Sequence, residues 1–119
     1  MDPDVKKEPL SFHEERLIFE SHRKLGNRWA DIAKELPGRT DNIVKNYFYS
    51  TLRRELRKVL KRIHGGEEVE PKEVSVGYIQ ELFKEYKLDY SELENQNVRR
   101  LIEHLDNKGT KLVSDSENR

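Results

Sequence analysis

The sequence has no cysteine and one tryptophan, and its 119 residues include only four prolines and six glycines. The absence of cysteine excludes disulfide bonds and thiolate metal sites. No apolar stretch approaches the roughly 20 residues that a transmembrane helix needs. The sequence also lacks a glycine-rich phosphate loop, and its histidines, His13, His22, His64 and His104, have no metal-ligand spacing. We therefore expect no metal, no cofactor, no catalytic residues and no enzymatic activity.

Charged residues make up 39% of the chain with a net charge of zero, but the two signs are unevenly placed. Residues 1–66 carry 15 Lys and Arg against 10 Asp and Glu, whereas residues 67–119 carry 8 against 13. The segment 39–62 is the most basic, with eight Lys and Arg against two acidic residues. A basic stripe along one helix is typical of a phosphate-binding surface, although a solvated helix face gives the same pattern.

Local signals predict a first helix over residues 12–25. Ser11 and Glu14 have the spacing of a capping box, and Gly26 is placed to end the helix in a left-handed conformation. The pair Glu14-Glu15 is therefore explained by capping and by the helix dipole, not by acid–base chemistry. The expected apolar side consists of Leu17, Ile18, Phe19 and Leu25.

A short second helix and a long third helix are predicted next. Asn27 is placed to cap the second helix, Pro37-Gly38 ends it, and Thr40 is placed to cap the third. Helical spacing predicts that the core includes Trp29, Ile32, Ala33 and Leu36 of the second helix and Ile43, Val44, Tyr47, Phe48, Thr51 and Leu52 of the third. The opposite side of the third helix is polar.

The spacing of several short motifs resembles a repeat of the Myb/SANT family. The motifs are Gly26-Asn27-Arg28-Trp29, Ile32-Ala33, the segment from Leu36 to Asn42, and Lys45-Asn46. The three large core aromatics of such a repeat correspond here to Leu10, Trp29 and Phe48, each nineteen residues from the next. The resemblance covers roughly residues 10–54 in a single copy. It implies a three-helix, homeodomain-like helix-turn-helix whose third helix enters the major groove of double-stranded DNA.

The resemblance also implies which residues meet the DNA. The expected base contacts are Lys45, Asn46, Tyr49, Ser50 and Arg53. The expected phosphate contacts are Arg28, Arg39, Asn42, Arg54, Arg57, Lys58 and Lys61. A smaller polar residue is usual at the position of Tyr49, so we expect a departure from the common sequence preference, with the ring on a sugar or a thymine methyl. The alternative is a SANT-type module that binds histone tails or a partner subunit instead of DNA.

Beyond the repeat, the third helix is expected to continue with an apolar stripe formed by Leu52, Leu56, Val59, Leu60 and Ile63. Apolar residues at helical spacing predict a fourth helix through Val76, Ile79, Leu82, Phe83 and Tyr86, and a fifth through Val98, Leu101, Ile102 and Leu105. Ser91 and Glu94 have the spacing of a capping box for the fifth helix. This pair of helices either folds back on the stripe or presents its apolar side to a protein partner or a second copy.

The predicted organisation is all-α. It comprises a flexible N-terminus (1–9) that does not resemble a signal peptide, a Myb-like domain with an extended recognition helix (10–64), an acidic linker (65–74), a C-terminal helical pair (75–105) and a disordered tail (106–119). Since a single repeat is a small DNA reader, we expect a nuclear DNA-binding subunit of a larger complex. Such a complex would act in transcription, chromatin or DNA modification such as adenine methylation, an expectation that rests on analogy alone.

Overall fold

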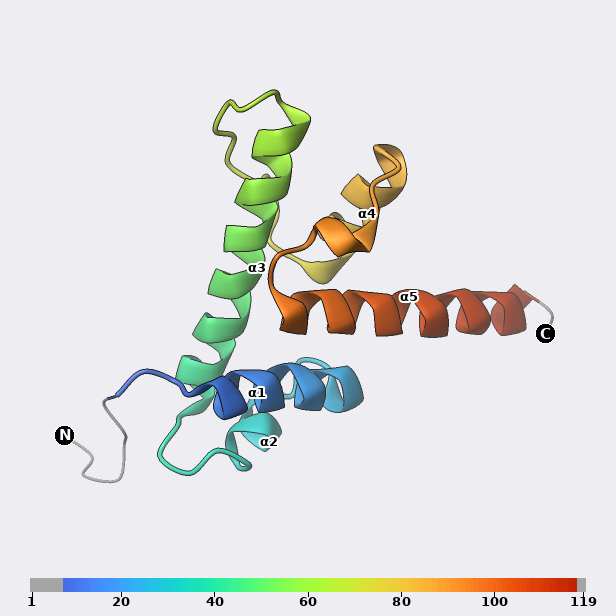
Figure 1. The fold of residues 1–119 in the computed structure, drawn as a ribbon. Helices are drawn as coiled ribbons and strands as arrows, with labels where there is room; N and C mark the ends of the chain where they lie inside the picture. The colour runs from blue at the N-terminus through green and yellow to red at the C-terminus, as the bar shows by residue number, and fades with distance from the viewer. Residues whose placement is uncertain (1–7, 118–119) are drawn as a thin grey trace. The chain divides into compact units, whose positions relative to one another are not determined.

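The structure is a computed structural model that describes the backbone of residues 8–117 and the side chains of residues 8–107. All regular structure in this part of the chain is helical, as predicted (Figure 1). The elements are α1 (Phe12–Leu25), α2 (Trp29–Ala33), α3 (Asp41–Ile63), α4 (Val76–Glu85), a 3₁₀ turn η1 (Tyr90–Glu92) and α5 (Gln96–Glu117). None of the described helices is long and apolar enough to cross a membrane.

The chain forms two compact units, Met1–Thr51 and Leu52–Arg119, and α3 continues without a break through the boundary. The boundary between these compact units falls inside the predicted DNA-binding domain, residues 10–64. The assignment of residues 10–64 to one functional domain stays a prediction. The flexibility expected for residues 1–9 falls largely on residues 1–7, which lie outside the described part of the chain.

In the first unit, α1 begins at the predicted capping box. Ser11 Oγ accepts the Glu14 backbone N–H at 3.1 Å, and the Glu14 carboxylate accepts the Ser11 N–H at 2.9 Å. Gly26 ends the helix with φ 69° and ψ −142°, a positive φ that favours glycine but not the left-handed helical conformation that was expected. The unit buries Ile18, Phe19, Ile32, Leu36, Val44 and Phe48.

The predicted cap of α2 is wrong. The helix begins after Arg28 with no side-chain cap, and Asn27 instead bonds His22 through its Oδ1 atom, 2.9 Å from Nε2. The core prediction is confirmed for Ile32 and for Leu36, whereas Trp29 and Ala33 are only half-buried. The helix ends at Ala33, so Leu36 lies after α2 and the end predicted at Pro37-Gly38 is too late.

The predicted start of α3 is confirmed, since Thr40 Oγ1 accepts the Ile43 N–H at 3.2 Å. On its core side, Val44, Phe48, Thr51 and Leu52 are buried, and Ile43 and Tyr47 are half-buried. The predicted division of α3 into an apolar and a polar face therefore holds.

In the second unit, the apolar stripe of α3 is covered within the chain. Leu52, Leu56, Val59 and Leu60 are at most 4% exposed, and Ile63 is half-buried. Of the two outcomes left open, the structure favours intramolecular packing. The stripe is therefore not a free surface in this chain, and a protein partner or homodimer through it and the C-terminal helices stays a prediction.

Helix α4 begins at Ser75, whose Oγ accepts the Tyr78 N–H at 3.0 Å. Its apolar side packs inward as predicted through Ile79, Leu82 and Phe83, but Tyr86 lies at the helix end and is 46% exposed. Tyr86 is therefore not part of the apolar side.

The capping box predicted for α5 is also wrong. Ser91 belongs to η1, where its N–H donates to Asp89 Oδ1 at 2.7 Å, and α5 starts five residues later. Asn95 Oδ1 accepts the N–H groups of Asn97 and Val98 at 2.9 and 3.1 Å, so Asn95 caps this helix. Val98, Leu101 and Ile102 of α5 are buried as predicted, and Leu105 is half-buried.

The backbone of α5 continues as a helix to Glu117, into residues 106–119, for which composition predicts disorder. The side chains beyond residue 107 and all of residues 118–119 lie outside the description. Disorder of this segment in solution stays a prediction.

Candidate nucleic-acid interface

The polar face of α3 is accessible. Lys45, Asn46, Ser50 and Arg53, four of the five predicted base-contact residues, are exposed, as is Asn42. They recur at steps of three and four residues, so one side of a single helix presents them together. The side chains supply an amide, an ammonium group, a guanidinium group and a hydroxyl. These are the donors and acceptors that can bond base edges in the major groove.

Tyr49, the fifth predicted base-contact residue, is held differently from its neighbours. It is half-buried, and its ring makes edge contacts with Trp29 at a centroid distance of 5.8 Å and with Phe48 at 5.4 Å. Because Phe48 is 1% exposed, the Tyr49 ring is an extension of the aromatic core onto the polar face.

The aromatic core behind this face includes a histidine. The His22 ring stacks on Phe48 at 4.2 Å and lies 5.3 Å from Trp29. Burial lowers the pKa of His22, and the hydrogen bond with Asn27 opposes this effect only in part. This burial favours the neutral imidazole, and the ring contacts give His22 a structural role in the core.

Arg39 does not lie where the phosphate prediction requires. Its side chain is 4% exposed, and its Nε and Nη2 atoms donate to the two oxygens of Glu14, each at 2.9 Å. The guanidinium also donates to the backbone carbonyls of Glu8 and Pro9 at 2.7 and 3.1 Å. With four of its five N–H donors used inside the unit, Arg39 has a structural role, and this burial does not favour the predicted phosphate contact. The hydrogen bond to Glu14 is also the main reason that the Arg39 pKa is raised.

Arg28 remains accessible, since its side chain is 67% exposed. It forms an ion pair with Asp31 at 2.8 Å across one turn of α2. Exposed pairs of this kind contribute at most about 1 kcal/mol, so this pair does not prevent a phosphate contact.

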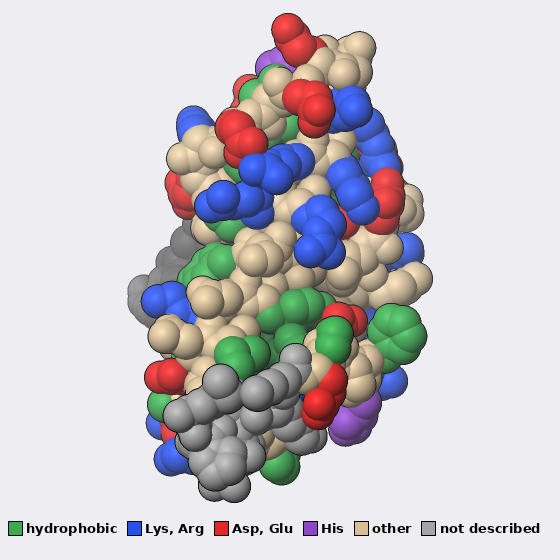
Figure 2. Space-filling model, turned by 90° about the vertical axis from the view of Figure 1, so that its left-hand side faces the viewer, with side chains coloured by type: hydrophobic (Ala, Val, Ile, Leu, Met, Phe, Trp, Pro, Cys, Tyr) green, Lys and Arg blue, Asp and Glu red, His purple; other side chains and the backbone are tan. Residues whose placement is uncertain are grey.

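The basic residues of the second half of α3 fall into two groups. Figure 2 shows Lys and Arg side chains gathered on one face over this part of the helix. Within the described part of the chain, Arg53, Arg54 and Lys61 form no ion pair, whereas Arg57 pairs with Glu70 at 2.8 Å. The first three therefore keep their charge free for a ligand, and Arg57 shares its charge with an exposed carboxylate.

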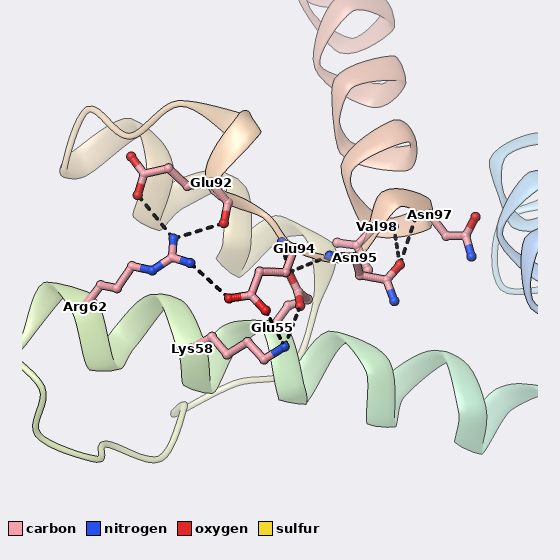
Figure 3. A network of polar contacts seen from close by, with 8 residues as sticks. All are labelled: Glu55, Lys58, Arg62, Glu92, Glu94, Asn95, Asn97 and Val98. Atoms are coloured by element: carbon pink, nitrogen blue, oxygen red, sulfur yellow. Dashed lines mark hydrogen bonds and ion pairs between the residues drawn. The ribbon is translucent and has the colours of Figure 1, made fainter.

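Lys58 and Arg62 belong to a polar network that joins α3 to the segment before α5 (Figure 3). Lys58 Nζ lies 2.9 Å from Glu94 Oε1, and Arg62 donates to the Glu92 carbonyl at 3.0 Å and to Glu94 Oε2 at 3.2 Å. The hydrogen bond to Glu94 raises the pKa of Lys58, and the same contact lowers the pKa of Glu94. This pairing occupies the Lys58 ammonium group in the free chain, and the phosphate contact of Lys58 stays a prediction.

Glu55 lies at the centre of this network and was not predicted from the sequence. Glu55 is 3% exposed, and its Oε1 accepts the backbone N–H groups of Glu94 and Asn95 at 2.9 and 3.3 Å. The one available signal was an acidic residue within an otherwise basic and apolar helical segment. Its partners lie 39 and 40 residues away, so their identity could not be predicted locally.

Comparison with known proteins identifies the first unit. Residues 7–52 match the family described as Myb-like DNA-binding domain. The chain is 53% identical over 58 residues to Myb-related protein A of Mus musculus, and 57% identical over 56 residues to Myb-related protein B of Gallus gallus. It is 52% identical over 56 residues to Transcription factor MYB98 of Arabidopsis thaliana. Residues 7–52 are thus a single Myb-like DNA-binding domain, as the motifs predicted.

The similarity covers about half of this chain and a small part of each relative. The matched segments cover 49%, 47% and 47% of this chain but only 8%, 8% and 13% of the three relatives. No solved structure matches the chain.

Proposed function

We propose that this protein binds double-stranded DNA by placing the polar face of α3 in the major groove. The observation that carries the proposal is the joint exposure of Lys45, Asn46, Ser50 and Arg53 on one side of a helix in a Myb-like domain. Asn46 is suited to bond an adenine edge bidentately, and Lys45 and Arg53 are suited to donate to guanine.

Phosphate contacts would position this helix without specifying sequence. Candidates that keep accessible side chains are Arg28, Asn42, Arg54 and Lys61, with Arg57 available once its exposed pair with Glu70 opens. Arg39 and Lys58 are not among them. In this proposal the N-terminal two-thirds of α3 contacts the bases. Basic side chains on the same helix and near the start of α2 contact the phosphates.

The relatives suggest the biological setting. They include proteins named as Myb-related and one named as a transcription factor, so we place this chain in the nucleus, in transcription regulation, with no catalysis of its own. A single Myb-like domain offers only a small surface for binding DNA. This favours a role as a DNA-binding subunit of a larger assembly in transcription, chromatin or DNA modification. Because the apolar stripe of α3 is buried in this chain, a partner that used it would have to displace the C-terminal helices.

The experiment that tests the groove assignment is a selection of preferred sites from a pool of random duplexes, followed by competition binding. Lys45→Ala and Asn46→Ala should each reduce discrimination between the selected and a random site, by about 1–3 kcal/mol if each makes a bidentate contact. Lys84→Ala removes an exposed lysine of α4 and is the matched control, which should keep full discrimination. Unchanged selectivity in both α3 variants would refute the assignment. Absence of DNA binding together with histone-tail binding would favour the SANT-type alternative.

A further inference from the structure

Tyr49 is an apolar ring set among polar side chains. Lys45 lies one helical turn before it and Arg53 one turn after it, while Asn46 and Ser50 flank it on the same face. A ligand that contacts these four exposed residues must therefore also lie against the Tyr49 ring.

The ring is fixed before any ligand arrives. Trp29 contacts it at an interplanar angle of 63° and Phe48 at 89°, and both contacts come from the core side. Edge-to-face packing of this kind stabilises an aromatic side chain, and a side chain that is already ordered loses little entropy on binding. Tyr49 therefore offers a preorganised apolar surface, unlike the long side chains around it.

The chemistry of the major groove contains one apolar group that matches such a surface. The C5-methyl group of thymine projects there, whereas the other base-edge groups are hydrogen-bond donors or acceptors. We infer that Tyr49 contacts the 5-methyl group of a thymine and that this contact sets the preferred base at one position of the site. The inference rests on the proposed function, because it requires α3 to lie in the groove.

The test uses the full chain and a selected duplex in which each thymine is replaced, one at a time, by deoxyuridine. The two bases differ only by the methyl group, so the pairing and the other groove contacts are kept. At one position the replacement should weaken binding by roughly fourfold, the value expected for one buried methyl. This loss should vanish in Tyr49→Asn and persist in Tyr49→Phe, which keeps the ring without the hydroxyl. Tyr86→Asn, the same substitution at an exposed tyrosine of the second unit, should leave the loss unchanged.

Three results would overturn the inference. The first is a wild-type chain that binds the selected site but loses less than twofold with deoxyuridine at every position. The second is a methyl dependence that remains in a folded Tyr49→Asn variant. The third is a dependence that disappears equally in Tyr49→Phe, which would assign the effect to the hydroxyl. Absence of binding to any duplex would instead refute the proposed function, and the inference with it.

Discussion

Replacement of Arg39 by alanine distinguishes the structural role of this residue from the phosphate contact that its sequence motif suggested. The guanidinium makes four hydrogen bonds at 2.7 to 3.1 Å, and the side chains of Arg39 and Glu14 are 4% and 12% exposed. Removing one partner of a buried pair costs about 3–5 kcal/mol, because the other charge is left uncompensated. Domains of this size are stable by only about 0.05–0.15 kcal/mol per residue. Arg39→Ala should therefore unfold much of the first unit at 25 °C.

The assay is urea denaturation followed by Trp29 fluorescence, because the one tryptophan lies in the first unit. A double-mutant cycle with Glu14→Gln isolates the pair, and the double variant should be more stable than the sum of the two single losses predicts. Arg28→Ala is the control, since it removes an exposed arginine and should change the stability by less than about 1 kcal/mol. An Arg39→Ala variant that keeps wild-type stability but loses DNA affinity and salt sensitivity would refute the structural assignment and restore the phosphate contact.

Three further predictions concern other parts of the molecule. Arg54→Gln and Lys61→Gln should each reduce the slope of log affinity against log salt by about 0.9, whereas Lys58→Gln should leave the slope unchanged; equal slopes for all three would contradict this division. Because burial lowers the pKa of His22, the unfolded chain binds more protons near pH 6.5, the usual pKa of histidine, so stability should fall as the pH drops from 7 through 6.5 toward the lowered pKa of the folded state. His22→Phe should flatten this part of a denaturation profile recorded against pH, and an unchanged profile would contradict the assignment. Glu55→Ala should destabilise the second unit by about 1–3 kcal/mol in urea denaturation, since it leaves two backbone N–H groups without their acceptor, and a change below 0.5 kcal/mol would contradict that role.

Much of the first unit could be predicted because its signals are local. The Ser11–Glu14 capping box spans three residues, and the two faces of α3 follow from a 3.6-residue period. The helix boundary at Leu25 also follows from the glycine after it. These features depend on neighbouring residues, which the sequence shows directly.

The sequence was least informative where distant residues decide which groups a side chain contacts. Arg39 has the charge of a phosphate ligand, but its partner Glu14 is 25 residues away and removes it from the surface. Ser91 has the right spacing for a cap, yet Asn95 caps α5 because the chain first makes the turn η1. Lys58 lies in a basic stripe, and only the folded second unit brings Glu94 to it. Charge and spacing alone could not distinguish these residues from accessible ones.

The central claim, that this chain binds duplex DNA through α3, is tested most directly by fluorescence anisotropy of the full chain against a random-sequence duplex across a salt series. The account predicts binding at low salt whose log affinity falls linearly with log salt, with a slope of roughly −0.9 for each phosphate contact. The accessible cations Arg28, Arg54 and Lys61 predict a slope of about −2.7, and Arg57 would bring it to about −3.6 once its pair with Glu70 opens, whereas the neutral Asn42 releases no counterion. No binding at low salt, or an affinity that does not change with salt, would contradict it.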